Sequence, residues 1–231
     1  MMFLNFVESI WFRPVSCVQP FLIRNQSIIY LSPATLRDEF GDRSILSDLG
    51  IPWQLGKAPK ALILSWHPPP AGWIKANTDG LAKGNPGLSA CGGLFRDTGG
   101  RFLGGFALAL GHQTAFHAEI MVVILAVEIA YERGWFHLWL ESDCLPIIHL
   151  LLNDSLHPPW PLQNRWMNCK LLVSKLYFRC SHTFRETNDV ADALANLGLH
   201  FDTLQWWPSP PPSIQSLLSH NANGFPCYRF S

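Results

Sequence analysis

The sequence contains little charge and no excess of either sign. Charged residues make up only 15% of its 231 residues, and the formal net charge at pH 7 is zero. Soluble domains are usually about 25% charged. The lack of a basic surplus argues against a strongly basic nucleic-acid binder, and the lack of an acidic surplus argues against an acidic disordered tail. Hydrophobic residues are plentiful at 48%, enough for a sizeable core.

Several further signals are missing. The six cysteines form no CxxC pair, which disfavours a disulfide framework and favours reduced thiols inside a cell. The nine histidines fall in no HExxH pattern, so we do not expect a zinc site. No apolar run approaches the roughly 18 residues of a membrane span. Glu8 and Arg13 interrupt the apolar start, which argues against a signal peptide. We therefore expect an intracellular protein, in the nucleus or cytoplasm, with no membrane partner.

The prolines divide the chain into three parts. Residues 1–65 show no sustained periodicity and contain several helix and strand breakers. Residues 66–70, a Pro-rich segment that begins with tryptophan, have the composition of a stiff extended linker, and the similar segment 206–212 indicates a second boundary. We expect an irregular N-terminal extension over residues 1–65, one domain over 66–200, and a Pro- and Trp-rich tail over 201–231.

Hydrophobic periodicity within 66–200 switches between the strand and helix patterns. The expected elements are strands at 73–78, 88–96 and 102–109, a helix at 115–133, a strand at 137–142, helices at 143–152 and 162–175, a strand at 177–184 and a helix at 188–199. The order β-β-β-α-β-α-α-β-α predicts an α/β fold, a mixed five-stranded sheet with helices packed on it.

Four acidic residues stand near the ends of these elements. Asp79 and Asp143 end strands, whereas Glu119 and Asp192 lie in the first turns of helices. Open α/β sheets place their sites at the carboxyl edge, where these four could converge. Clustered carboxylates repel unless a cation intervenes, and two Mg²⁺ or Mn²⁺ ions can activate water against a phosphodiester. Each acid taken singly could equally be a turn residue, a cap or a helix-dipole partner.

The residues around these acids resemble the type 1 ribonuclease H family, and more narrowly its reverse-transcriptase-like domains of plants and retroelements. The similar stretches, in the family's order, are residues 73–80, 92–97, 99–100, 117–119, 140–143 and 185–195. They cover about three-fifths of the chain. The resemblance implies the ribonuclease H fold, which has the element order predicted above.

The resemblance also implies a set of site residues. The family's metal ligands map onto Asp79, Glu119, Asp143 and Asp192, which implies two Mg²⁺ ions, with Mn²⁺ as a substitute. The family uses a mobile histidine shortly before the last aspartate, and His182 occupies the similar place. The other interpretation of His182 is an ordinary half-exposed histidine at a strand end.

The implied activity is endonucleolytic hydrolysis of the RNA strand of RNA–DNA hybrids, with the duplex recognised by its shape and 2′-hydroxyls. Backbone amides of Gly80 and residues 84–87 are candidate contacts to phosphate or sugar. Asn188 is either a substrate contact or a helix N-cap. Residues 66–200 contain ten basic and eleven acidic residues, so we expect weak, salt-sensitive binding. The alternative function is a catalytically idle nucleic-acid-binding or interaction module derived from a retroelement, and no protein partner can be named.

Overall fold

The computed structural model describes residues 28–30 and 60–230. The chain divides into two compact units, Trp66–Phe225 and the residues on either side of it. The flanking unit contains an antiparallel sheet of order β1-β2-β9, formed by Ile28–Tyr30, Lys60–Leu64 and Cys227–Phe230. The rest of the expected N-terminal extension, residues 1–27 and 31–59, lies outside the described residues.

The larger unit is built on a mixed sheet of order β7-β6-β3-β4-β5-β8. Its strands are β3 (Ile74–Gly84), β4 (Gly87–Arg96), β5 (Phe102–Gln113), β6 (His137–Ser142), β7 (Tyr177–His182) and β8 (Gln205–Trp207). Strands β3, β4, β5 and β8 pair antiparallel, while β6 and β7 continue the sheet from β3 in parallel. The predicted mixed α/β architecture is confirmed, but the sheet has a sixth strand, β8.

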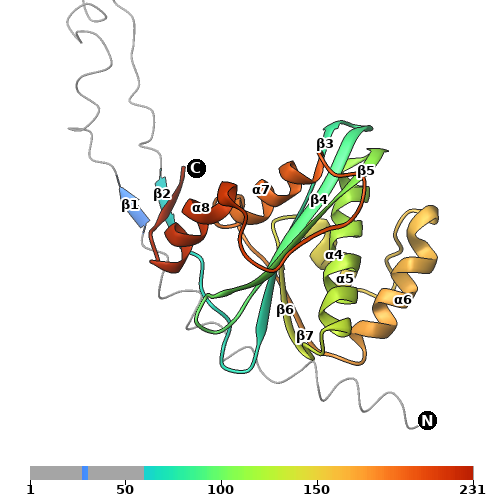
Figure 1. Cartoon of the computed structure of the whole chain (residues 1–231), viewed down its shortest axis with the longest axis horizontal. Helices are drawn as coiled ribbons and strands as arrows, with labels where there is room; N and C mark the ends of the chain where they lie inside the picture. Colours follow the sequence, from blue (N-terminus) through green and yellow to red (C-terminus); the bar gives the residue numbers. More distant parts are fainter. Residues whose placement is uncertain (1–27, 31–59, 231) are drawn as a thin grey trace, which may run out of the picture. The chain divides into compact units, whose positions relative to one another are not determined.

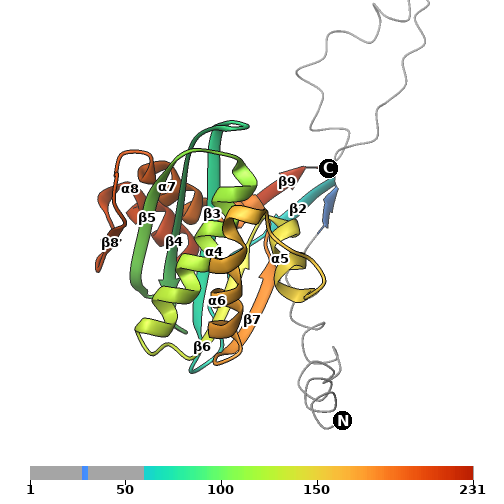
Figure 2. The ribbon, with the colours of Figure 1, turned by 90° about the vertical axis from the view of Figure 1, so that its right-hand side faces the viewer.

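Helices cover both faces of this sheet (Figures 1 and 2). They are α4 (Ala115–Glu132), α5 (Leu145–Leu152), α6 (Gln163–Val173), α7 (Asp189–Gly198) and α8 (Pro212–Ala222), with short 3-10 turns at Trp160–Leu162 and Arg185–Thr187. In Figure 1, α4, α5 and α6 lie on one side of the sheet, and α7 and α8 lie on the other. Among the described residues, none of the helices has the length and apolar character needed to span a bilayer.

Two glycines allow helices to approach the central strands closely. A Cβ on Gly80 of β3 would lie 2.4 Å from the backbone nitrogen of Glu119, so α4 rests directly on that strand. A Cβ on Gly92 of β4 would lie 2.3 Å from the nitrogen of Ala195, so α7 rests on the opposite face. Both contacts lie beside Asp79, whose register partner is Gly92. The absence of two side chains therefore brings both helices to the same part of the sheet.

The two Pro-rich segments belong to the larger unit. Trp66 is buried, and its indole Nε1–H donates to Asn77 Oδ1 at 3.0 Å. We expected residues 201–231 to form a tail, but residues 201–225 contribute β8 and α8 to the unit. Ile214 of α8 is fully buried in the cluster that contains Leu94. Pro212 is the first residue of α8, a position where proline is well tolerated.

Candidate metal centre

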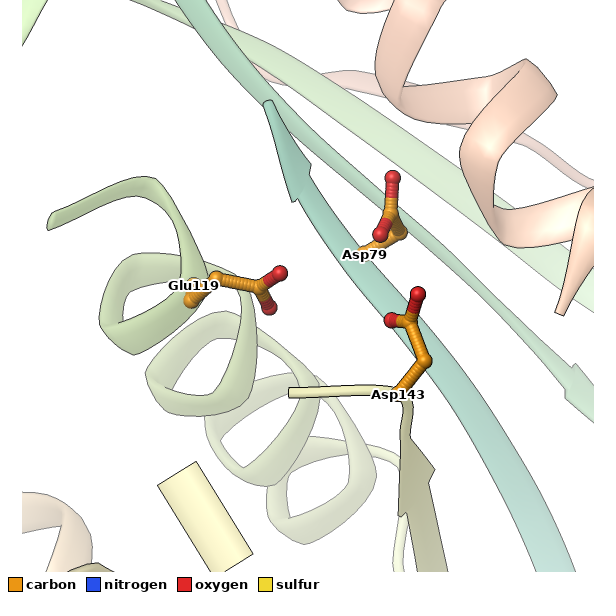
Figure 3. A group of neighbouring side chains, drawn as sticks. All are labelled: Asp79, Glu119 and Asp143. Atoms are coloured by element: carbon orange, nitrogen blue, oxygen red, sulfur yellow. The ribbon is translucent and has the colours of Figure 1, made fainter. Parts of the chain in front are cut away.

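Three of the four predicted acidic residues converge at one end of the β3–β6 pairing. Asp79, Glu119 and Asp143 each offer an oxygen within 4.8 Å of the other two (Figure 3). The parallel pairing of β3 with β6 ends at Thr78 and Ser142, and Asp79 and Asp143 are the next residues along the chain. Asp143 directly follows β6, whereas Asp79 lies inside β3, which continues to Gly84 and does not end at Asp79 as expected. Glu119 points toward them from the adjoining helix α4, which is seated on β3 through Gly80.

Burial makes this group of carboxyls electrostatically strained. Asp79 and Glu119 are 4% and 8% exposed. Burial first, and then the charges of Asp143 and Asp192, raise the pKa of Asp79 to about 7. Burial also raises the pKa of Glu119 well above its usual value, with further contributions from Asp79 and Asp143. Like charges in a poorly solvated site favour the protonated form unless a cation neutralises them.

The donor set fits a divalent cation. Oε2 of Glu119 is buried and has no hydrogen-bond partner among the described residues. Buried acceptors are normally satisfied, so an orphaned carboxylate oxygen facing two other carboxylates indicates room for a ligand. Hard oxygen donors of this kind suit Mg²⁺ or Mn²⁺. Asp79, Glu119 and Asp143 are the residues that would hold the ion.

Asp192 lies outside this close group. It occupies the first turn of α7, is partly exposed, and accepts a hydrogen bond from Asn196 Nδ2 at 3.2 Å. Its charge nevertheless contributes to the raised pKa of Asp79. The structure therefore brings together three of the four residues predicted as ligands, with the fourth within electrostatic reach.

His182 and Arg185 lie at the edge of the group. The exposed ring of His182 places Nε2 3.1 Å from the backbone oxygen of Asp143. Arg185 is 77% exposed, with Nε 4.0 Å from Asp143 Oδ2, and its charge opposes the rise in the pKa of Asp79 and Glu119. Arg185 is a residue of the site that was not predicted from the sequence. Its position shortly before Asp192, at the start of the last family-like stretch, was the available signal.

The two predicted substrate contacts have partners within the protein. Asn188 is 2% exposed, and its Nδ2 donates to the Thr78 carbonyl at 3.0 Å and to Asp143 Oδ1 at 3.2 Å. It occupies the N-cap position of α7, but its side chain makes no capping bond. The backbone of Gly80 hydrogen-bonds the Glu119 carboxyl and thereby opposes the rise in the pKa of Glu119. In this structure both residues therefore support the acidic group.

Comparison with known proteins agrees with the fold. The reverse transcriptase-like family matches residues 77–198, slightly more than half of the chain. A candidate ribonuclease H protein of Arabidopsis thaliana is 35% identical over 170 residues, which are 70% of this chain and 26% of the relative. This chain thus spans about a quarter of that relative's length. Ribonuclease HI of Halobacterium salinarum is 28% identical over 150 residues, 62% of this chain and 73% of the relative.

Solved structures give the same result. The crystal structure of ribonuclease H1 from Halobacterium salinarum matches with a TM-score of 0.50 and 28% identity, over 55% of this chain and 97% of that one. LC11-RNase H1, solved in complex with an RNA/DNA hybrid, has the same fold, with a TM-score of 0.50 and 24% identity over 55% of this chain and 96% of its own. The larger unit is thus a ribonuclease H fold. The chain belongs to the reverse transcriptase-like family of ribonuclease H domains.

Proposed function

We propose that this protein is a metal-dependent ribonuclease that cleaves the RNA strand of RNA–DNA hybrids. The observation that carries the proposal is the group of three carboxylates within 4.8 Å, one of which has a buried oxygen without a partner. The group lies on a ribonuclease H fold, in a chain whose relatives are named as ribonucleases H. An idle binding module would have no need to keep such an electrostatically costly group.

Two Mg²⁺ ions, or Mn²⁺ in their place, would supply an activated water and stabilise the leaving oxygen of the phosphodiester. The residues proposed to hold them are Asp79, Glu119 and Asp143, with Asp192 as the fourth ligand. Asn188 orients the Asp143 carboxylate through its hydrogen bond.

The exposed side chains at the edge of the site would meet the substrate. His182, whose Nε2 lies beside Asp143, is the residue proposed to accept or release a proton. Arg185 presents an exposed guanidinium that suits a phosphate of the cleaved strand. Residues 66–200 contain no surplus of basic residues, so binding of the hybrid is expected to be weak and to fall with salt. Location in the nucleus or cytoplasm stays a prediction.

A cleavage assay tests the proposal directly. The full chain is incubated with a labelled RNA–DNA hybrid and Mg²⁺ or Mn²⁺, beside Asp79→Asn and Glu119→Gln variants. Asp202→Asn, at an exposed position, is the matched control. We expect cleavage by the full chain and by the control, and a loss of about 100-fold or more in the two site variants. Binding without cleavage in both metals, or cleavage unchanged by Asp79→Asn, would favour the idle module.

A further inference from the structure

The two aspartates of the metal centre are the last members of a polar row that continues along the same face of the sheet. Alternate residues of a strand share a face, and the parallel register aligns β3 with β6. The row contains Lys75, Asn77 and Asp79 on β3, and Trp139, Glu141 and Asp143 beside them. We use the name polar ladder for the other four residues of the row and two side chains that contact them. The polar ladder consists of Lys75, Asn77, Trp139 and Glu141, with Trp66 and Arg96.

The ladder holds a fully enclosed lysine. The Lys75 side chain is 2% exposed, and its Nζ donates to Glu141 Oε1 at 2.8 Å and to the His67 carbonyl at 2.7 Å. The same ammonium lies 3.7 Å from the ring centroid of Trp139. A buried ammonium with three such partners is held in one position, because moving it would leave a charge without compensation.

Trp66 connects two cations of the ladder. The Arg96 guanidinium lies 3.5 Å from the Trp66 ring centroid, and Lys75 Nζ lies 5.3 Å from it. Both Trp66 and Arg96 are buried. Trp66 comes from the Pro-rich segment that precedes β3, so this segment is attached to the sheet by cation–π contacts and a hydrogen bond.

Asn77 is the junction of the ladder. Its Oδ1 accepts from Trp66 Nε1 at 3.0 Å and from Arg96 Nη2 at 2.7 Å. Its Nδ2 donates to Glu141 Oε2 at 3.2 Å and to Asn188 Oδ1 at 3.5 Å. An amide side chain has two acceptor sites and two donor hydrogens, so all four are used. A rotated amide would oppose donors to donors and acceptors to acceptors, which defines one orientation.

That orientation is passed to the metal centre. With its Oδ1 turned to Asn77, Asn188 directs its Nδ2 to the Thr78 carbonyl and to Asp143 Oδ1. Thr78 immediately precedes Asp79 in β3, and Asp143 directly follows β6, so one amide connects the backbone beside one aspartate to the carboxylate of the other. If Asn188 flipped, its carbonyl would meet the Asp143 carboxylate and repel it.

We propose that the polar ladder is a positioning device for the metal centre, in which Trp66 and Arg96 orient Asn77, Asn77 orients Asn188, and Asn188 fixes Asp143 beside Asp79. The proposal rests on the proposed function in one respect, that the three carboxylates bind a divalent ion. Trp66 and Asn77 are then positioning residues that touch no ion and no substrate.

The test measures Mn²⁺ affinity by calorimetry, without nucleic acid, on the full chain and on Trp66→Phe. Phenylalanine keeps an aromatic ring but removes the Nε1–H donor to Asn77. We expect Mn²⁺ to bind roughly three- to tenfold more weakly, the effect of one lost hydrogen bond. In the cleavage assay kcat at a fixed, subsaturating Mn²⁺ concentration should fall, while KM for the hybrid stays unchanged. Trp160→Phe is the matched control, because Trp160 is 83% exposed.

A double-mutant cycle separates positioning from general stability. Asn188→Leu is close to asparagine in size and removes the donor to Asp143 without adding a charge, and we expect it to weaken Mn²⁺ binding more than Trp66→Phe does. In the Asn188→Leu background Trp66→Phe should have no further effect on affinity, because the relay is already broken. If Trp66→Phe folds poorly, Asn77→Asp replaces it in the cycle, since it is isosteric and removes both donors of Asn77.

The outcomes distinguish this proposal from the proposed function. Native Mn²⁺ affinity in a folded Trp66→Phe, or effects that multiply in the double variant, would overturn the ladder's role. Coupled losses of affinity in a chain that cleaves no hybrid would support the ladder and overturn the ribonuclease. A full chain that binds no Mn²⁺ would overturn both.

Discussion

The metal centre and the polar ladder are neighbouring groups of buried charge around β3 and β6, and they resolve the cost of burial in opposite ways. In the ladder, Lys75 and Glu141 form an ion pair at 2.8 Å. In the centre, three carboxylates face one another, and Glu119 Oε2 has no partner among the described residues. Arg96 Nε in the ladder also lacks a hydrogen-bond partner, but its guanidinium stacks on an indole.

The pKa shifts reflect this difference. In the ladder, burial lowers the pKa of Lys75 and lowers that of Arg96 to about 9, and the charge of Glu141 opposes both shifts. In the centre, burial raises the pKa of Asp79 to about 7, and its neighbouring acids add to the shift. The chain compensates the ladder from within, whereas the centre requires a cation from outside. Four predictions test this contrast, in order of decreasing effect.

The largest effect is expected from removing the cation of the ladder. Lys75→Met leaves Glu141 buried without its partner, and we expect a loss of about 3–5 kcal/mol in the free energy of unfolding, measured in urea. The double variant Lys75→Met/Glu141→Gln should recover a substantial part, because no lone charge remains. A loss below about 1 kcal/mol in the single variant would mean that the pair contributes no more than a surface pair does.

Removing a charge from the metal centre should raise the free energy of unfolding instead of lowering it. Asp79→Asn relieves repulsion, so we expect it to stabilise the fold by about 1–2 kcal/mol at pH 8 in EDTA, as a raised pKa implies. The same variant should lose hybrid cleavage. If Asp79→Asn destabilises the EDTA-treated protein, the carboxylates are not strained in the way we describe.

The pH dependence of stability should follow from the same shift. Asp79 keeps its proton up to about pH 7 in the folded chain, whereas an unfolded aspartate releases it near 3.8. Between these values the folded state binds more protons, so stability in EDTA should fall as pH rises from 4 to 7. The raised pKa of Glu119 acts in the same direction. Thermal unfolding scans should show a smaller fall in stability with pH for Asp79→Asn. Replacing EDTA by excess Mg²⁺ should also oppose the fall, because an ion that binds only the folded state stabilises it.

The smallest effect is expected at a pair that is only partly buried. Arg165 Nη2 lies 2.7 Å from Glu128 Oε2, with side chains 41% and 27% exposed. Solvent screens such a pair, so Glu128→Gln should cost less than about 1 kcal/mol in urea unfolding. A cost similar to that of Lys75→Met would show that burial is not what separates the ladder from ordinary ion pairs.

The acidic residues could be predicted from sequence because local pattern carries their placement. Asp79 and Asp143 follow strand-like stretches, and the order of elements implies that these strands are neighbours. The support of Asp143 could not be predicted in the same way. A cap is the usual role of asparagine at a helix start, and only the packing of α7 against β3 brings Asn188 within reach of Asn77.

The extent of the domain depended on packing that local pattern does not contain. Strand β8 has only three residues, too few to show a period. It pairs with β5 at a position where Gly104 leaves space, since a Cβ there would lie 2.1 Å from Trp206 Cζ2. Prolines beside an ordered element resemble a linker or a domain boundary when only the sequence is considered, and residues 66–70 and 206–212 are examples.

The contact between Arg96 and Asn221 has a consequence for synthesis of the protein. Arg96 Nη1 donates to Asn221 Oδ1 at 3.0 Å, across 125 positions of the chain. The ribosome synthesises the chain from its N-terminus, and domains generally fold as units. The strand that carries Arg96 therefore emerges long before the helix that completes its burial. In the nascent domain this guanidinium gains its last partner only when α8 has formed. A chain on a ribosome stalled near residue 200 would therefore lack strand β8 and helix α8.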